Sequence, residues 1–120
     1  MRGILILAHG SREKSTEQTL QQVVKYLGEI FSEEIIETAY LQFSNLDLHT
    51  GLEKLRAKGV DNIIVIPYFL FEGVHIKEDI PKEIDKYLKE NKDVKITMGK
   101  TLGADKRLAE ILADRIRDAL

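Results

Sequence analysis

Four short apolar runs alternate with four helical patterns along this chain, and that alternation restricts its fold more than any other feature. The runs cover residues 4–8, 35–41, 63–66 and 94–98. The segments whose apolar residues recur at helical spacing are 20–31, 48–55, 76–88 and 108–116. A β-α-β-α-β-α-β-α order predicts an α/β fold with a parallel sheet, right-handed crossovers and helices on both faces.

We expect the whole chain, residues 1–120, to form one domain, because this length is typical of a single domain and no linker, repeat or low-complexity stretch divides it. The expected order of the four strands in the sheet is 2-1-3-4. In that order the first and third strands are neighbours, and ligands of open parallel sheets bind beyond the carboxyl ends of strands at such a switch point.

Three local signals predict where elements begin or end. Ser15 and Gln18, three residues apart, predict a capping box at the start of the first helix. Pro67 ends the third strand, since proline cannot donate a hydrogen bond to the sheet. The last helix is expected to begin after the segment 103–105.

The composition excludes several classes of protein. With 18 basic and 20 acidic residues the net charge is −2, and no basic stripe is available to bind nucleic acid. There is no cysteine, so thiolate metal sites and cysteine nucleophiles are excluded. No apolar segment approaches the roughly 20 residues that span a bilayer, and the first apolar run is too short for a signal peptide. We therefore expect a cytoplasmic protein that does not bind membranes.

Two histidines follow the carboxyl ends of the two strands that we expect to be neighbours. His9 comes directly after the first strand, and His75 ends the loop that follows the third. Imidazole binds cobalt, nickel, iron and zinc, and it accepts protons near neutral pH. A single histidine at a strand end is more often an ordinary loop residue. Two of them on adjacent strand ends predict a metal site.

Other side chains of these loops have two interpretations each. Arg12, Lys14 and Lys77 could hold carboxylates or be solvated surface charges. Tyr68, Phe69 and Phe71 could line a wall for a flat ring, or belong to the core or to a subunit interface.

Glycines and a third histidine carry weaker signals. Gly10 and Gly73 are explained equally well as turn residues. No Gly-Lys-Ser/Thr follows the first strand, so the sequence gives no support for ATP binding. His49 lies in the second helical segment, and we leave it out of the site.

Several motifs together, in order and correctly spaced, resemble those of the class II tetrapyrrole chelatases, specifically the small sirohydrochlorin cobaltochelatases. The resemblance extends from the first strand to the last helix. The motifs are His9-Gly10-Ser11-Arg12, Pro67-Tyr68-Phe69-Leu70, Gly73-Val74-His75, Asp79-Ile80-Pro81 and Leu102-Gly103-Ala104-Asp105.

The resemblance implies a fold like one lobe of the longer, two-lobed members, whose cleft holds the macrocycle. A single lobe would then form a homodimer to build that cleft. The resemblance also implies that His9 and His75 bind the incoming metal, that no ATP is needed, and that no cofactor is required beyond the substrate metal. The residues that it places against the tetrapyrrole are Gly10, Ser11, Arg12, Gln42, Phe69, Leu70, Gly73, Val74 and Lys77.

One position departs from the family pattern. Members often carry a glutamate at the end of the second strand, in a stretch like Ala-Phe-Leu-Glu, where this chain has Ala39-Tyr40-Leu41-Gln42. An amide can hydrogen-bond, but it cannot accept a proton as a base. Glu37 and Glu72 are the nearest acidic residues that could compensate.

The function that these features predict is ATP-independent insertion of a divalent metal, Co²⁺ first, into sirohydrochlorin or its oxidised neighbour on the route to cobalamin. Nickel for a methanogenic cofactor and iron for siroheme remain alternatives, since imidazole does not choose among these metals. A non-catalytic carrier of metal or tetrapyrrole is the alternative from another class. A flavodoxin-like domain that binds phosphate is a third, and it predicts basic and hydroxyl-rich loops where this chain has histidines and aromatics.

Overall fold

The structure is a computed structural model of residues 1–120, and it describes all of them except for the side chains of His75 and Ile76. The strands are β1 (Arg2–Ala8), β2 (Ile35–Tyr40), β3 (Asn62–Pro67) and β4 (Lys95–Met98). The helices are α1 (Lys14–Ile30), α2 (Leu48–Ala57), the π-helical turn η1 (His75–Asp79), α3 (Ile80–Glu90) and α4 (Lys106–Ala119). No helix in the described chain has both the length and the apolar character needed to cross a bilayer.

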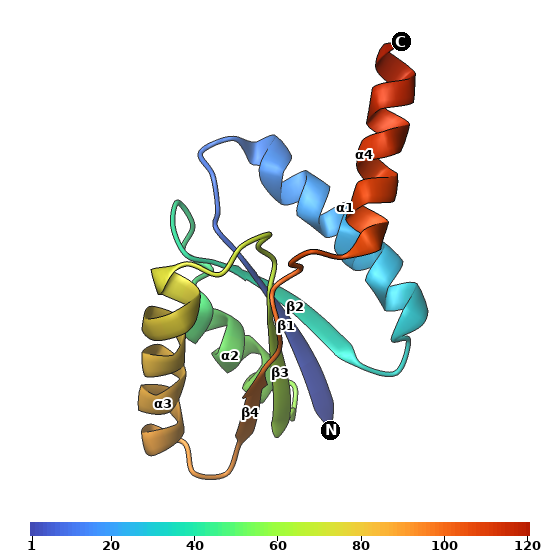
Figure 1. Cartoon of the computed structure of the whole chain (residues 1–120). Coiled ribbons are helices and arrows are strands. Elements are labelled where there is room, and N and C mark those ends of the chain that lie inside the picture. Colours follow the sequence, from blue (N-terminus) through green and yellow to red (C-terminus); the bar gives the residue numbers. More distant parts are fainter.

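The four strands form one parallel sheet in the order β2-β1-β3-β4 (Figure 1). β1 lies inside the sheet, where Leu5 is paired with Glu37 on one side and with Val65 on the other. The predicted fold class and strand order are confirmed. Because β1 and β3 are neighbours, the loops that follow them leave the same edge of the sheet side by side.

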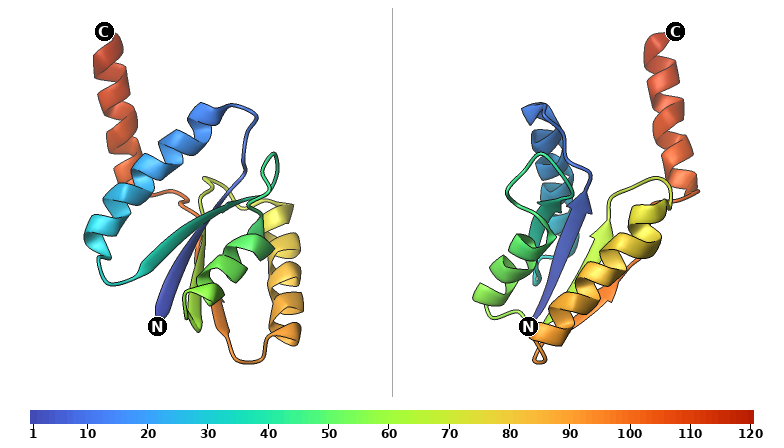
Figure 2. Two further views of the ribbon diagram at one scale, coloured as in Figure 1. Left: turned by 180° about the vertical axis from the view of Figure 1, so that it is seen from behind. Right: turned by 90° about the vertical axis from the view of Figure 1, so that its left-hand side faces the viewer.

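The helices cover both faces of the sheet, as the sequence predicts (Figure 2). On one face α2 and α3 bury a core that includes Leu5, Leu52 and Ile84, and on the other α1 covers Ile4, Ile6 and Tyr40. Alternate residues of each strand supply the two faces, because successive side chains of a strand point to opposite sides.

Two helix starts differ from the predictions. The capping box is wrong: α1 already begins at Lys14, Glu13 occupies the cap position without a side-chain bond, and Ser15 lies inside the first turn. The third helical segment begins with the π-helical turn, and the α-helix proper starts only at Ile80. Pro81 explains that boundary, because proline fits the first turn of an α-helix, where its missing N–H is not needed.

The last helix, α4, does not pack on the sheet. It projects away from the body of the protein (Figures 1 and 2) and has no buried residue. The segment before it is held by two backbone bonds, from the N–H of Leu102 to the oxygen of Phe69 (2.9 Å) and from the N–H of Gly103 to the oxygen of Leu70 (3.1 Å). Asp105 then caps the helix through the N–H of Arg107.

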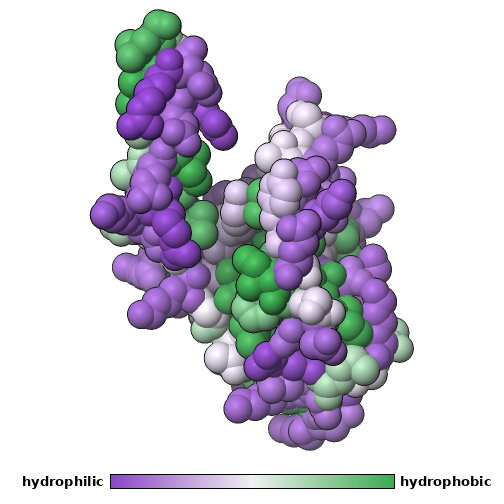
Figure 3. Space-filling view, turned by 90° about the vertical axis from the view of Figure 1, so that its right-hand side faces the viewer, coloured by the Kyte–Doolittle hydropathy of each residue, from purple (hydrophilic) through white to green (hydrophobic). Residues whose placement is uncertain are grey.

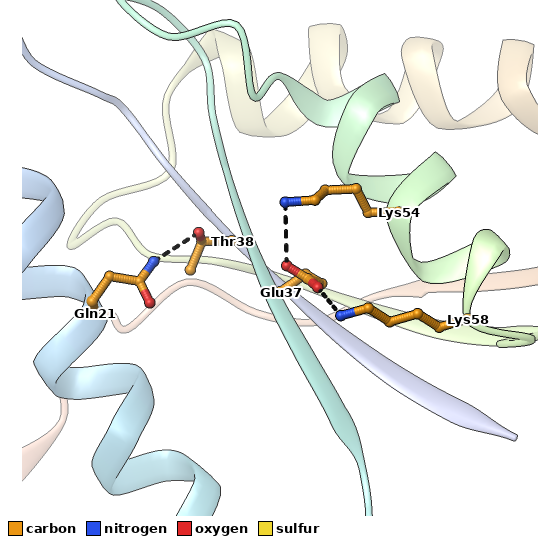
Figure 4. A network of polar contacts seen from close by, with 5 residues as sticks. All are labelled: Gln21, Glu37, Thr38, Lys54 and Lys58. Carbon is orange, nitrogen blue, oxygen red and sulfur yellow. Dashed lines mark hydrogen bonds and ion pairs between the residues drawn. The ribbon is translucent and has the colours of Figure 1, made fainter.

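Polar side chains on β2 alternate between the two faces (Figure 4). Thr38 points toward α1, where its hydroxyl accepts a hydrogen bond from Gln21 Nε2 at 3.1 Å. Glu37 points the other way and forms ion pairs with Lys54 (3.9 Å) and Lys58 (2.5 Å). Both polar contacts therefore tie helices to the edge strand β2.

Asp47 caps α2, and we expect its removal to weaken the fold measurably. Its Oδ1 accepts a hydrogen bond from the N–H of Thr50 at 2.9 Å. Loss of an N-cap costs about 0.5–2 kcal/mol, so Asp47→Ala should lower the free energy of unfolding by about 1 kcal/mol in urea denaturation at neutral pH. An unchanged unfolding midpoint would show that the cap adds nothing.

The same cap should make stability depend on pH. The bond from Thr50 lowers the pKa of Asp47 below its ordinary value. Since the folded pKa is the lower one, the carboxylate contributes fully above the ordinary carboxyl pKa, and that contribution is lost as the pH falls through the folded value. Asp47→Asn keeps a capping side chain that does not titrate. The variant should be less stable than the natural chain at neutral pH, and this difference in the free energy of unfolding should shrink in acid.

Candidate metal and tetrapyrrole site

His9 leaves the sheet at the carboxyl end of β1, where the buried strand ends and the chain becomes exposed. Its ring lies against the ring of Phe69, with the ring centroids 4.2 Å apart and an angle of 39° between the planes. Phe69 follows β3 and is only 6% exposed, because it belongs to the core under α2 and α3. A buried aromatic ring thus supports an exposed imidazole.

Backbone hydrogen bonds join the loops after β1, β2 and β3 at this edge. The N–H of Gln42 donates to the oxygen of His9 (3.0 Å), and the N–H of Leu41 donates to the oxygen of Ala8 (3.0 Å). On the other side, the N–H of Tyr68 donates to the oxygen of Leu7 (2.7 Å). The position of the His9 backbone is therefore set from both neighbouring strands.

Gly10 is required by the close approach of these loops. Its φ is +89°, and a Cβ at this position would lie 2.0 Å from the backbone oxygen of Gln42. The structure thus favours a packing reason for this glycine over an ordinary turn. The residue that follows, Ser11, uses its hydroxyl to accept a bond from the N–H of Glu13.

Arg12 lies over the ring of Phe43, with its guanidinium carbon 4.8 Å from the ring centroid. The two side chains border an open hollow of about 840 Å³ along the first turns of α1. Other lining residues include Ser11, Lys14, Gln18 and Lys25. Phe43 was missed by the sequence reasoning, and its positive φ of 59° gives no signal in the sequence.

The residues that the sequence predicts on the loop after β3 are mostly exposed. Leu70 (49%) and Val74 (58%) present apolar surface, and Gly73 accepts a backbone bond from Lys77 at 3.1 Å. The side chain of His75, the second predicted ligand, lies outside the described residues.

Gln42 is exposed, and its backbone N–H donates to the backbone oxygen of His9, so the departure from the family pattern falls next to the histidine loop. Glu37, one of the two candidates for compensation, lies on β2 opposite Leu5 and forms ion pairs with Lys54 and Lys58 (Figure 4). As a compensating base it stays a prediction. Glu72 is exposed on the loop after β3 and stays a prediction.

The third histidine contacts residues of α2 and α3. His49 is on α2, where its Nε2 is 3.7 Å from Glu53 and its ring packs edge-on against Tyr87. Among the described side chains, which do not include that of His75, no group of three or more His, Cys, Asp or Glu residues gathers that could hold a metal ion.

Comparison with known proteins gives a consistent result. A family model described as CbiX matches residues 3–119. A protein of Sulfurisphaera tokodaii named sirohydrochlorin cobaltochelatase is 36% identical over 120 residues, which are all of this chain and 95% of the relative. The resemblance inferred from the motifs is thereby confirmed.

Two solved structures share the fold. The sirohydrochlorin chelatase SirB from Bacillus subtilis subspecies spizizenii, in complex with cobalt, is 28% identical and superimposes with a TM-score of 0.89. SirB from Bacillus subtilis with Fe³⁺ is 29% identical, with a TM-score of 0.86. The match covers 98% of this chain in both cases, but only 50% and 47% of the SirB chains. This chain therefore corresponds to about half of such a protein.

Proposed function

Because the chain belongs to the CbiX family, we propose that it is a chelatase that inserts a divalent metal ion into sirohydrochlorin or a close relative. In this reaction the metal forms bonds to the ring nitrogens, and two pyrrole N–H protons leave. The Sulfurisphaera relative carries the name of this activity, and SirB is a sirohydrochlorin chelatase. We propose cobalt as the metal, cobalamin biosynthesis as the pathway and no requirement for ATP.

The single observation that carries the proposal is the placement of His9. Its imidazole stands exposed at the switch point of the sheet, braced by the Phe69 ring 4.2 Å away. A neutral imidazole can bind a partly dehydrated metal ion and can also accept a proton. We propose that His9 and His75 do both, since the loop that carries His75 follows the strand next to β1.

The remaining predicted residues would hold the macrocycle. Cationic Arg12 and Lys77 suit the carboxylates of sirohydrochlorin, because a guanidinium or ammonium group pairs with a carboxylate through charge-assisted hydrogen bonds. Apolar contacts would come from the exposed side chains of the loop after β3. The residues proposed for these contacts, together with the backbone at the histidine loop, are Gly10, Ser11, Gln42, Phe69, Leu70, Gly73 and Val74.

Nickel and iron stay open as alternative metals. Imidazole binds iron, cobalt and nickel with affinities that follow one general order, so a histidine ligand does not by itself select among them. SirB structures contain cobalt in one case and Fe³⁺ in another. The choice of metal must then depend on what enters the site rather than on His9 itself.

A non-catalytic carrier is the second candidate, and Gln42 is the observation that favours it. Gln42 is exposed, its backbone N–H donates to the backbone oxygen of His9, and it stands where a carboxylate is often found in the family; an amide cannot take up a proton. A protein with this substitution could bind metal or tetrapyrrole without accelerating the insertion.

We also propose that the active form is a homodimer. One copy presents the histidine loops on an open edge, and SirB is about twice as long as this chain. A second copy would supply the opposite wall for the macrocycle.

The proposal is tested by an anaerobic absorbance assay with sirohydrochlorin and Co²⁺, and with Ni²⁺ or Fe²⁺ in parallel. We expect the protein to accelerate insertion over the spontaneous reaction without added ATP, most strongly with Co²⁺. Tight binding of sirohydrochlorin without acceleration would favour the carrier. Neither binding nor acceleration with any of the metals would overturn both functions.

A further inference from the structure

The loop after β2 holds an exposed aromatic side chain in a strained backbone conformation. Phe43 is 51% exposed, and its φ of 59° lies in the left-handed region, where a bulky residue is an outlier. Burial of the ring does not explain this conformation, because half of the residue is in solvent. Strain of this kind is typical of ligand sites, and it persists only where the surrounding structure imposes it.

Backbone hydrogen bonds on both sides of Phe43 impose the conformation. Before it, the N–H of Gln42 donates to the oxygen of His9 (3.0 Å). Around it, the N–H of Tyr40 donates to the oxygen of Leu46 (2.8 Å), which closes the turn. The turn lies beside the loop that follows β1 (Figures 1 and 2), and Phe43 is presented to that loop.

The side chain that meets Phe43 is Arg12. Its guanidinium carbon is 4.8 Å from the ring centroid, the geometry of a cation–π contact. Stacking fixes the plane of a guanidinium and leaves its N–H edge free, and that edge fits a carboxylate through two parallel hydrogen bonds. Among the described residues no carboxylate forms an ion pair with Arg12. Phe43 therefore holds a cation whose binding edge is available.

Two lysines extend this cationic surface along α1. Lys14 and Lys25 line the open hollow of about 840 Å³ that Arg12 borders. They lie on the same flank of the helix, about three turns and 16 Å apart. Glu17 is the one acidic residue of the lining, so the hollow is cationic although the whole chain carries a net charge of −2. α4 stands apart from α1 (Figures 2 and 3) and leaves the hollow open.

The hollow begins at the candidate metal loop. Arg12 lies three residues after His9 on one wall. Phe43 lies on the other wall, directly after Gln42, whose N–H binds the backbone oxygen of His9. A flat ligand seated over His9 would therefore reach the hollow with its rim.

We infer that the hollow beside α1 is a subsite for carboxylate arms of the tetrapyrrole. In this subsite Phe43 positions Arg12 for the arm nearest His9, and Lys14 and Lys25 bind carboxylates farther along α1. The inference rests on the proposed function, because it takes the macrocycle as the ligand of the His9 loop. Sirohydrochlorin carries carboxylate arms around its rim, so capture of the arms on one side would fix the orientation of the ring.

The lysines are tested by titrating the protein with metal-free sirohydrochlorin and following its absorbance. Exposed ion pairs are weak, so we expect Lys14→Gln and Lys25→Gln each to raise the Kd by about threefold. Because salt screens exposed charges, the Kd of the double variant should depend less on ionic strength than that of the natural chain. The control removes the same charge from α3 and the turn after it: Lys89→Gln with Lys92→Gln should leave the Kd unchanged.

The positioning role of Phe43 is tested by a double-mutant cycle with Arg12. Arg12→Ala should raise the Kd by about tenfold, the usual effect of losing hydrogen bonds to a charged group. Phe43→Asn should also raise it, without lowering the unfolding midpoint, because asparagine tolerates the left-handed region. The double variant should bind no more weakly than Arg12→Ala alone, since two residues that act through one contact are not additive.

Two further variants separate the ring of Phe43 from its backbone and from aromatic exposure in general. Phe43→Tyr keeps the stacking surface and should keep the Kd. Phe31→Asn removes another exposed phenylalanine, at the far end of α1, and should leave the Kd unchanged. Additive effects of the Phe43 and Arg12 variants would overturn the positioning role.

The outcomes separate this subsite from the reaction. A chain that inserts cobalt while the Kd stays the same in the lysine and Arg12 variants would overturn the inference and leave the chelatase standing. Binding of citrate that depends on these cations, with sirohydrochlorin binding unaffected by the variants, would show a site for a free acid and also overturn it. The expected changes in Kd without any acceleration of insertion would support the subsite and contradict the chelatase alone.

Discussion

His9→Ala is expected to lower the catalysed rate of cobalt insertion by about 10²- to 10⁴-fold, the usual contribution of a positioned general acid or base. It should also weaken Co²⁺ binding, since the same imidazole is the proposed ligand. The fold should persist, because the backbone oxygen of His9, which accepts the bond from Gln42, is kept in the variant. The measurement is the anaerobic absorbance assay combined with a Co²⁺ titration.

His49→Ala is the matched control for this variant. It removes the imidazole on α2 that pairs with Glu53, and the rate of insertion should not change. The double variant His9→Ala, His75→Ala should abolish acceleration altogether. Full activity in the double variant would show that neither imidazole takes part in the reaction.

Gly10→Ala is expected to damage both stability and activity. The added methyl group would lie 2.0 Å from the backbone oxygen of Gln42, so the loops after β1 and β2 must move apart. A non-glycine residue at a positive φ of this kind costs about 1–3 kcal/mol in addition. We expect a lower unfolding midpoint, together with a lower insertion rate because His9 is displaced.

Gly28→Ala separates this effect from the general cost of replacing a glycine. Gly28 lies in α1, and a Cβ there meets no atom within 4 Å. Alanine in a helix interior is favoured over glycine by about 0.5–1 kcal/mol, so this variant should be slightly more stable. If Gly10→Ala behaved like Gly28→Ala, the close approach at Gln42 would not be a constraint.

The parts of the fold that the sequence predicted are those that depend on periodicity. The buried runs around Leu5 and Val65 and the helical spacing around Leu52 have one interpretation each, and the strand order follows from packing rules for parallel sheets. The position of α4 was not predictable in this way. The spacing of Leu108 and Leu112 indicates a helix with an apolar side, but it does not say which molecule covers that side.

The sequence predicted which loops form the candidate site, but it predicted fewer of the side-chain contacts within them. The sheet edge that brings His9 near Phe69 follows from strand order, so this proximity could be expected. The stacking of Arg12 on Phe43 depends on loop conformation, which leaves no periodic pattern. The ion pairs of Glu37 were equally out of reach, because a sequence does not show that two lysines reach the same carboxylate.

The central place of β1 has a consequence for folding. β1 is the first segment of this chain, yet Leu7 pairs with Pro67, sixty positions later. Pairing across such a separation is slow compared with local structure, because a long loop must close first. One side of the apolar segment 4–8 can pair with β2 early, but its other side must stay unpaired until β3 has been made, exposed to aggregation. His9 gains its aromatic support only when that loop has closed, so a partly folded chain lacks the proposed metal site.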